Sequence, residues 1–121
     1  MMTEGEWSIV LYLEASGRSP VQEFLEGLDA RTLARFIAST EQLVLRNISA
    51  REPLVSHLEG KVWEIREQSG PNTYRLLYFV ASRRRIVLLH GFQKKTRKTP
   101  RREIEVALRR MGTFIQREGG G

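Results

Sequence analysis

Positive side chains are concentrated in the stretch LHGFQKKTRKTPRR, residues 89–102, where a strand-like run leads into the start of a helix. Arg101 and Arg102 fall in the expected first turn of that helix, where each opposes the helix dipole by roughly a few tenths of a kcal/mol. Four further cations precede them and repel one another: Lys94, Lys95, Arg97 and Lys98. A bound anion would relieve this repulsion, so the stretch predicts a site for phosphate.

Charged residues also interrupt the strand-like runs before this stretch. In the run KVWEIRE, strand alternation places Glu64 and Arg66 on one face, and Arg75 lies in the following run, TYRLLYFVA. A guanidinium group binds phosphate oxygens with two hydrogen bonds, so Arg66 and Arg75 are candidates to stabilise a phosphoryl transition state. The alternative is a partly buried ion pair of Glu64 with Arg75 or Arg66.

Lysine and histidine side chains near this stretch could transfer a proton, and a phenylalanine could contact a nucleobase. Lys94 or Lys95 becomes a general base if neighbouring cations lower its pKa, whereas His90 titrates near neutrality without such help. Phe92 could stack on a nucleobase, and packing in the core is the equal alternative. His57 and His90 are the only histidines, and an isolated histidine in a strand more often packs than reacts.

Other classes of chemistry lack a sequence signature. The chain has no cysteine, no His and carboxylate cluster at metal-ligand spacing, no glycine-rich phosphate loop before a helix and no GxSxG motif. We therefore expect no metal and no cofactor. The net charge of +6 is unevenly spread, because residues 1–81 carry −3 and residues 82–110 carry +9. Such a field favours a polyanion, RNA or DNA before an anionic membrane.

The elements that must position these residues can be inferred along the chain. A strand is expected over 7–13. A helix should follow that is capped by Ser19, with Pro20 as its first residue and Gln22 completing a capping box. Asp29 should cap a second helix. After Pro53, three strands are expected over 61–67, 73–81 and 86–92, and then a last helix capped by Thr99. This order predicts an α+β fold with a twisted, mainly antiparallel sheet (β-α-α-β-β-β-α). Helices on one face would leave the other face of the last strands partly open for the site.

The 121 residues predict a single domain over 1–121, with an ordered core at about 5–116 and a flexible C-terminal glycine tail. The acidic start MMTEGEWSIV lacks the pattern of a signal peptide, and no apolar run approaches about 20 residues. We therefore expect a cytoplasmic protein that does not interact with a membrane.

Several of these motifs together resemble the RelE superfamily of toxins. They are LEGKVWEIR (58–66), YRLLY (74–78), HGFQKKTRKTP (90–100) and EIEVA (103–107). The combination of the WEIR strand with FQKKTRKTP is similar, more narrowly, to the phage-derived, HigB-like branch of type II toxin–antitoxin systems. The resemblance covers about residues 5–112.

The resemblance implies a ribosome-dependent mRNA endoribonuclease, an mRNA interferase, that needs no metal. It implies that a helix-turn-helix antitoxin of the HigA type neutralises the toxin, and it allows a heterotetramer with that antitoxin. The other partners would be mRNA on the ribosome and ribosomal RNA. Arg66 falls on the strand arginine that contacts the scissile phosphate, Lys94 and Lys95 on the basic pair ending the last strand, and Lys61 near a position that is often basic.

The candidate catalytic residues are thus Arg66, Arg75, Lys94, Lys95 and His90. The candidate substrate-binding residues are Lys61, Phe92, Arg97, Lys98, Arg101 and Arg102. Arginines 83–85 form a turn and are either idle, solvated charges or contacts to ribosomal RNA. Two other functions remain open, a non-catalytic module that binds RNA or DNA and an interaction protein that only holds an antitoxin. Catalysis would be distinguished by variants that lose turnover while keeping binding.

Overall fold

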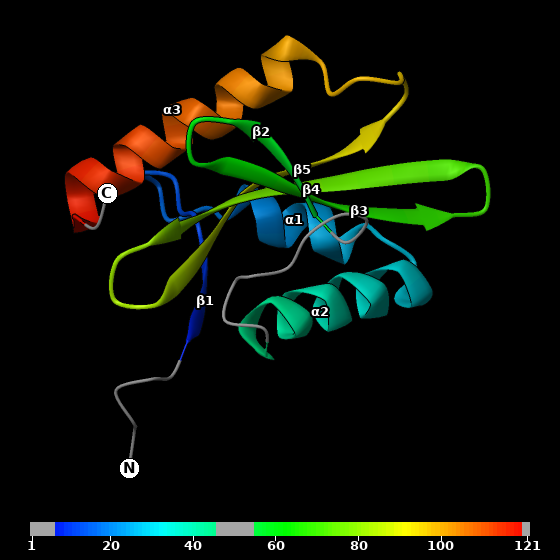
Figure 1. Ribbon diagram of the computed structural model, residues 1–121, viewed down its shortest axis with the longest axis horizontal. Helices are drawn as coiled ribbons and strands as arrows, with labels where there is room; N and C mark the ends of the chain where they lie inside the picture. Colours follow the sequence, from blue (N-terminus) through cyan, green and yellow to red (C-terminus); the bar gives the residue numbers. More distant parts are fainter. Residues whose placement is uncertain (1–6, 46–54, 120–121) are drawn as a thin grey trace.

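A five-stranded mixed sheet separates helices on its two faces, as the computed structural model of residues 7–45 and 55–119 shows (Figure 1). The strand order is β1-β5-β4-β3-β2, with β1 parallel to β5 and the other pairs antiparallel. The elements are β1 (Ser8–Leu11), α1 (Pro20–Glu26), α2 (Ala30–Leu45), β2 (Val55–Glu59), β3 (Val62–Ser69), β4 (Asn72–Ala81), β5 (Arg85–Lys94) and α3 (Arg101–Glu118).

The predicted α+β class is confirmed, and the sheet has one strand more than expected. The additional strand, β2, has the sequence VSHLE, which is short and contains three polar residues, so its apolar alternation is weak. It forms a hairpin with β3 through Gly60, whose φ of 55° is accessible to glycine. Pro53, which was expected to precede the strands, lies outside the described residues.

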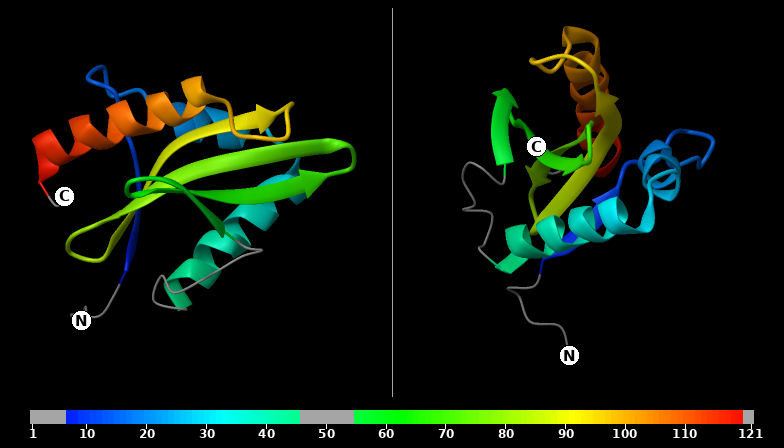
Figure 2. Two further views of the ribbon diagram at one scale, coloured as in Figure 1. Left: turned by 45° about the horizontal axis from the view of Figure 1, so that its top comes forward. Right: turned by 90° about the vertical axis from the view of Figure 1, so that its right-hand side faces the viewer.

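The two N-terminal helices pack on one face of the sheet, as predicted, whereas the C-terminal helix covers the other face, so the expectation that all helices lie against one face was wrong. α1 and α2 cover one face and α3 the other, as the end-on view makes clear (Figure 2). The reason is visible in β4, where Leu76, Leu77, Tyr78 and Phe79 are all buried in succession. A strand with apolar residues on both faces needs a covering layer on each of them.

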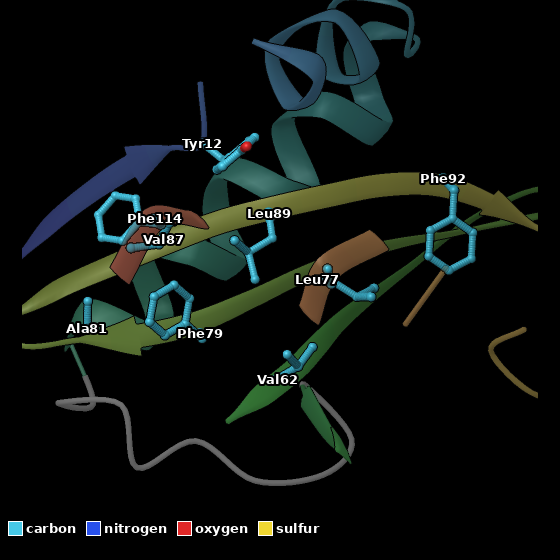
Figure 3. Close-up of a cluster of buried hydrophobic side chains, with 10 residues drawn as sticks. Tyr12, Val62, Leu77, Phe79, Ala81, Val87, Leu89, Phe92 and Phe114 are labelled. Carbon is cyan, nitrogen blue, oxygen red and sulfur yellow. The ribbon is translucent and has the colours of Figure 1, made fainter. Parts of the chain in front are cut away.

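Two hydrophobic clusters fill the space on either side of the sheet. On one side, Phe36 and Leu43 of α2 pack in a cluster with Ile65, Leu76 and Tyr78 of the sheet, among others. Beneath α3, the side chains of β4 and β5 meet Ala107 and Phe114 of the helix, and Phe92 lies at the other end of the cluster from Phe114 (Figure 3). The part of this face beyond the start of α3 carries the charged residues.

An irregularity in β5 changes which side chains face α3. Leu77 pairs with His90 and Tyr78 pairs with Leu88, which leaves Leu89 as an extra residue in β5. This bulge lets both Leu89 and His90 reach the α3 side, because Leu89 joins the cluster there and His90 contacts Glu103 of α3. The strand then resumes its alternation through to Lys94.

Two of the three predicted helix caps are confirmed. Oγ of Ser19 accepts the backbone N–H of Gln22 at 3.2 Å, with Pro20 as the first helical residue, and Oδ1 of Asp29 accepts that of Thr32 at 2.8 Å. The Gln22 side chain does not complete a capping box, because it donates to Glu26 instead. Thr99 is not the cap of α3: Pro100 occupies that position without a side-chain hydrogen bond.

Candidate active site

An open pocket of about 550 Å³ lies where β4 begins and β5 ends. It is on the same side of the sheet as α3, beyond the part that the helix covers. Its walls come from the two strands, from the β3–β4 turn and from the chain that leads toward α3. The lining residues are Pro71, Thr73, Arg75, Gln93, Lys94, Lys95, Thr96 and Arg97. The predicted basic pair and two predicted arginines therefore contribute to one concave surface.

Sheet register explains why residues distant in the sequence meet here. Thr73 lies opposite Lys94, Arg75 lies opposite Phe92, and Arg66 on β3 lies opposite Arg75. Directly opposed residues in antiparallel strands share a face, and residues two apart along a strand share it too. Arg66, Arg75 and Lys94 are therefore placed on the same face by three neighbouring strands.

A buried carboxylate partly balances this positive charge. Nε of Arg75 lies 3.7 Å from Oε2 of Glu64, and both side chains are less than 10% exposed. The predicted ion pair of Glu64 with Arg75 is thus confirmed. The second carboxylate oxygen, Oε1, accepts a 2.7 Å hydrogen bond from the hydroxyl of Thr99. Glu64 is the counter-ion that makes burial of a guanidinium at the pocket wall less costly.

The pKa of Lys94 depends on its burial and on the charges of Arg75, Glu64 and Arg66. Burial lowers its pKa, the nearby guanidinium groups of Arg75 and Arg66 lower it further, and the carboxylate of Glu64 acts in the opposite direction. Nζ of Lys94 also donates a hydrogen bond to the carbonyl oxygen of Arg97. A lysine with a lowered pKa is better able to accept a proton near neutral pH.

The remaining predicted cations divide between the pocket and other surfaces. Lys95 and Arg97 are exposed on the pocket wall. Lys61 and Lys98 are exposed and do not line the pocket. Arg101 forms an ion pair with Glu59 of β2 and another with Glu105, and Arg102 lies 3.9 Å from Glu103. Ion pairs with the protein's own carboxylates reduce the positive charge that these two arginines offer to a substrate.

His90 and Phe92 lie beneath α3 rather than on the pocket wall. Nε2 of His90 is 2.8 Å from Oε1 of Glu103, and its Nδ1 is 3.3 Å from a guanidinium nitrogen of Arg110. The Arg110 group can only donate, so Nδ1 accepts and Nε2 carries the proton of a neutral ring. Burial also favours the neutral ring, because it lowers the pKa of His90, although the hydrogen bond to Glu103 acts in the opposite direction. Phe92 is 9% exposed and stacks on His90, which favours its core-packing alternative.

Some pocket residues were not singled out by sequence reasoning. Thr73, Gln93 and Thr96 contribute polar groups, and Thr99 supports Glu64 from outside the pocket. The signal for Thr73 was available, because a short β4–β5 connection places the start of one strand against the end of the other. The sequence held no comparable signal for Thr99, because its hydroxyl was expected to cap the last helix and not to contact Glu64.

Within residues 7–45 and 55–119, no three His, Asp or Glu side chains are grouped so that they could ligate a metal ion. None of the helices in this part of the chain combines the length and the apolarity needed to cross a membrane.

The fold and a match to a protein-family model identify the class of protein. A three-helix, five-strand α+β domain of this kind is compatible with the RelE-like fold. A protein-family model described as "Phage derived protein Gp49-like (DUF891)" matches residues 23–112. The chain belongs to this Gp49-like family, a RelE-like, toxin-like family of toxin–antitoxin systems. A search of curated proteins found no match.

Proposed function

We propose that this protein is the toxin of a type II toxin–antitoxin pair, of the HigB-like branch, and that it cleaves mRNA on the ribosome without a metal ion. The observation that carries the proposal is the convergence of Arg66, Arg75 and Lys94 on one sheet face beside an open pocket. Membership of a toxin-like family supports the same function.

The reaction consistent with these groups is attack of a ribose 2′-hydroxyl on the adjacent phosphorus. A bond forms between O2′ and phosphorus, the bond from phosphorus to O5′ breaks, and the products are a 2′,3′-cyclic phosphate and a 5′-hydroxyl. Lys94 in its neutral form takes the proton of the 2′-hydroxyl, because burial and two guanidinium groups lower its pKa. The ammonium group of Lys95, on the same wall, returns one proton to O5′.

The two arginines have different parts in this reaction. Arg75 is buried and paired with Glu64, so it holds one side of the pocket in place and adds little net charge. Arg66 is less buried and lies opposite Arg75, so its guanidinium is the better group to bind the phosphate oxygens as negative charge develops. Removing one preorganised donor of this kind typically slows a reaction about 10²- to 10³-fold.

The shape and charge of the pocket support the proposed requirement for the ribosome. The pocket is open and rich in cations, so it attracts RNA without fixing the angle between O2′, phosphorus and O5′. A message held in the decoding site would already be aligned, and the protein would then supply only charge and proton transfer.

The partners in this proposal are mRNA and ribosomal RNA, and an antitoxin with a helix-turn-helix DNA-binding part that neutralises the toxin. A heterotetramer of two toxins and two antitoxins is one assembly consistent with such a pair. The site of action is then the cytoplasm, where ribosomes translate.

Cleavage of a defined message by purified protein tests the proposal. Wild-type protein should produce new mRNA 5′ ends only when translating ribosomes are present. Lys94→Ala and Arg66→Ala should slow their formation at least about 10²-fold while retaining ribosome binding. Arg31→Ala, an exposed arginine of α2, removes the same charge elsewhere and should cleave normally. Variants that lose binding in proportion to charge, with no cleavage by the wild type, would instead identify a non-catalytic RNA-binding module.

A further inference from the structure

The turn between β4 and β5 contains an unfavourable backbone conformation. Arg83 has a φ of 63° and Arg84 a φ of 55°, and they are the only non-glycine residues of the described chain with a positive φ. This left-handed region suits glycine and asparagine, whereas a long side chain is destabilised there by contact of its Cβ with the backbone. Two consecutive arginines at such positions suggest a role other than stability.

The side chains of this turn are arranged in two ways. Arg85 folds back on the protein, since its Nε donates to the carbonyl of Ser82 at 2.8 Å and its guanidinium lies over the ring of Phe114. Arg83 and Arg84 are exposed, and within the described residues neither pairs with a carboxylate. The guanidinium of Arg84 lies 5.8 Å from the ring centre of Trp7, which restricts its motion and preserves its charge.

The turn lies at the opposite end of the β4–β5 hairpin from the pocket (Figure 1). β4 and β5 contain ten residues each, so the two cationic sites are about 30 Å apart at the usual rise of a strand. A single nucleotide or a short oligonucleotide in the pocket cannot reach the turn. A ligand that contacts both must be a large polyanion.

We propose that Arg83 and Arg84 form a second RNA-binding site, which contacts the phosphate backbone of ribosomal RNA while the pocket holds the message. This inference rests on the proposed function, because it assigns the second RNA to the ribosome. Guanidinium groups on a short, restrained turn match phosphate geometry and interact with RNA regardless of sequence. The ribosome has RNA on all sides of the message, so one rigid hairpin can contact both.

The decisive variant is Arg83→Asn/Arg84→Gly, examined in a Lys94→Ala background so that no cleavage intervenes. Asparagine and glycine fit the left-handed conformation, so the melting temperature should rise. Affinity for ribosomes at about 0.1 M salt should fall roughly tenfold, and the slope of log affinity against log salt should become shallower by about 2. Affinity for a single-stranded RNA of about three nucleotides, which is too short to extend from the pocket to the turn, should not change.

Three further variants complete the test. Arg83→Lys/Arg84→Lys keeps the charge and should bind ribosomes nearly as well as the parent. Arg83→Gln/Arg84→Gln keeps side-chain length, and should lose ribosome affinity without gaining thermal stability. Arg31→Ala should behave as the parent, because it removes a charge from α2.

Unchanged ribosome affinity in both charge-removing double variants would overturn the inference. A loss of affinity for the short RNA equal to that for ribosomes would overturn it as well, because it would assign the turn to the pocket's ligand. Failure of the nuclease proposal is a separate result, an absence of cleavage by wild-type protein. These measurements of binding do not depend on cleavage.

Discussion

The hydroxyl of Thr99 donates a 2.7 Å hydrogen bond to Oε1 of Glu64, and so connects the segment that leads into the last helix to the third strand. The other oxygen of the same carboxylate lies 3.7 Å from Nε of Arg75 on β4. One buried carboxylate thereby links the chain entering α3 with two strands. This link positions the segment 95–97, which forms one wall of the pocket.

Thr99 and Glu64 should therefore be energetically coupled. Thr99→Val should lower the free energy of unfolding by about 1 kcal/mol, since it removes one hydrogen bond to a buried charge. Glu64→Gln should cost about 3 kcal/mol, because the buried guanidinium of Arg75 loses its counter-ion. Urea denaturation of both variants and the double variant should give a coupling energy of about 1 kcal/mol. Thr96→Val, which alters an exposed hydroxyl, is the matched control, and strict additivity would contradict the link.

Cleavage should depend on pH through Lys94. Since the neutral amine is the active form, the single-turnover rate on ribosomes should rise with pH and level off above the pKa of Lys94, which lies below its ordinary 10.5. Glu64→Gln should move the midpoint to lower pH, because Glu64 raises that pKa. Lys94→Arg should abolish the rise, as a guanidinium does not deprotonate. A pH profile that Lys94→Arg leaves intact would assign the base elsewhere.

Arg66 should matter for cleavage more than for ribosome binding. Arg66→Gln should slow single-turnover cleavage about 10²- to 10³-fold by removing a donor to the phosphate. Ribosome binding by Arg66→Gln should stay close to that of the wild type, because the lost donor acts mainly on the transition state. Equal losses of activity and of thermal stability would point to a structural role.

Gly91 should tolerate no larger residue while Phe24 is present. A Cβ at position 91 would lie 2.2 Å from Cδ2 of the Phe24 ring on α1. Gly91→Ala should therefore destabilise the protein by about 1–3 kcal/mol through displacement of α1. In a Phe24→Leu background the further cost of Gly91→Ala should be smaller, as denaturant titrations of the four proteins would reveal. Gly112→Ala, on exposed helix surface with open space around it, serves as the control.

Stability should fall on mild acidification because of His90. Burial lowers the pKa of His90 in the folded protein below its ordinary 6.5, so between these two values the unfolded chain binds more protons. The stability from neutral His90 is complete above about pH 6.5 and is lost as the pH falls through the folded pKa. His90→Gln should flatten the dependence of the melting temperature on pH between about 5 and 7. An unchanged slope would contradict the neutral, buried ring.

Several features of the fold followed from local patterns. Ser19, Pro20 and Asp29 predicted two helix starts, because capping depends on side chains within one turn of the chain. The hairpin of β4 and β5 followed from two apolar runs with a short connection. β2 was missed because its five residues form a strand by pairing with β3, and long-range pairing leaves no strong local pattern.

Residue types and motifs along the chain were enough to identify the components of the site: the cations after β5, the arginines of β3 and β4, and a glutamate that needed a partner. Their arrangement depended on the folded structure. Sheet register selected Arg75 as the partner of Glu64, a bulge at Leu89 directed His90 to Glu103, and Thr99 left its expected cap for a carboxylate 35 residues away. Residue type and spacing limit which interactions are available, but the choice among them depends on distances and burial that exist only after the strands pair and α3 covers the sheet.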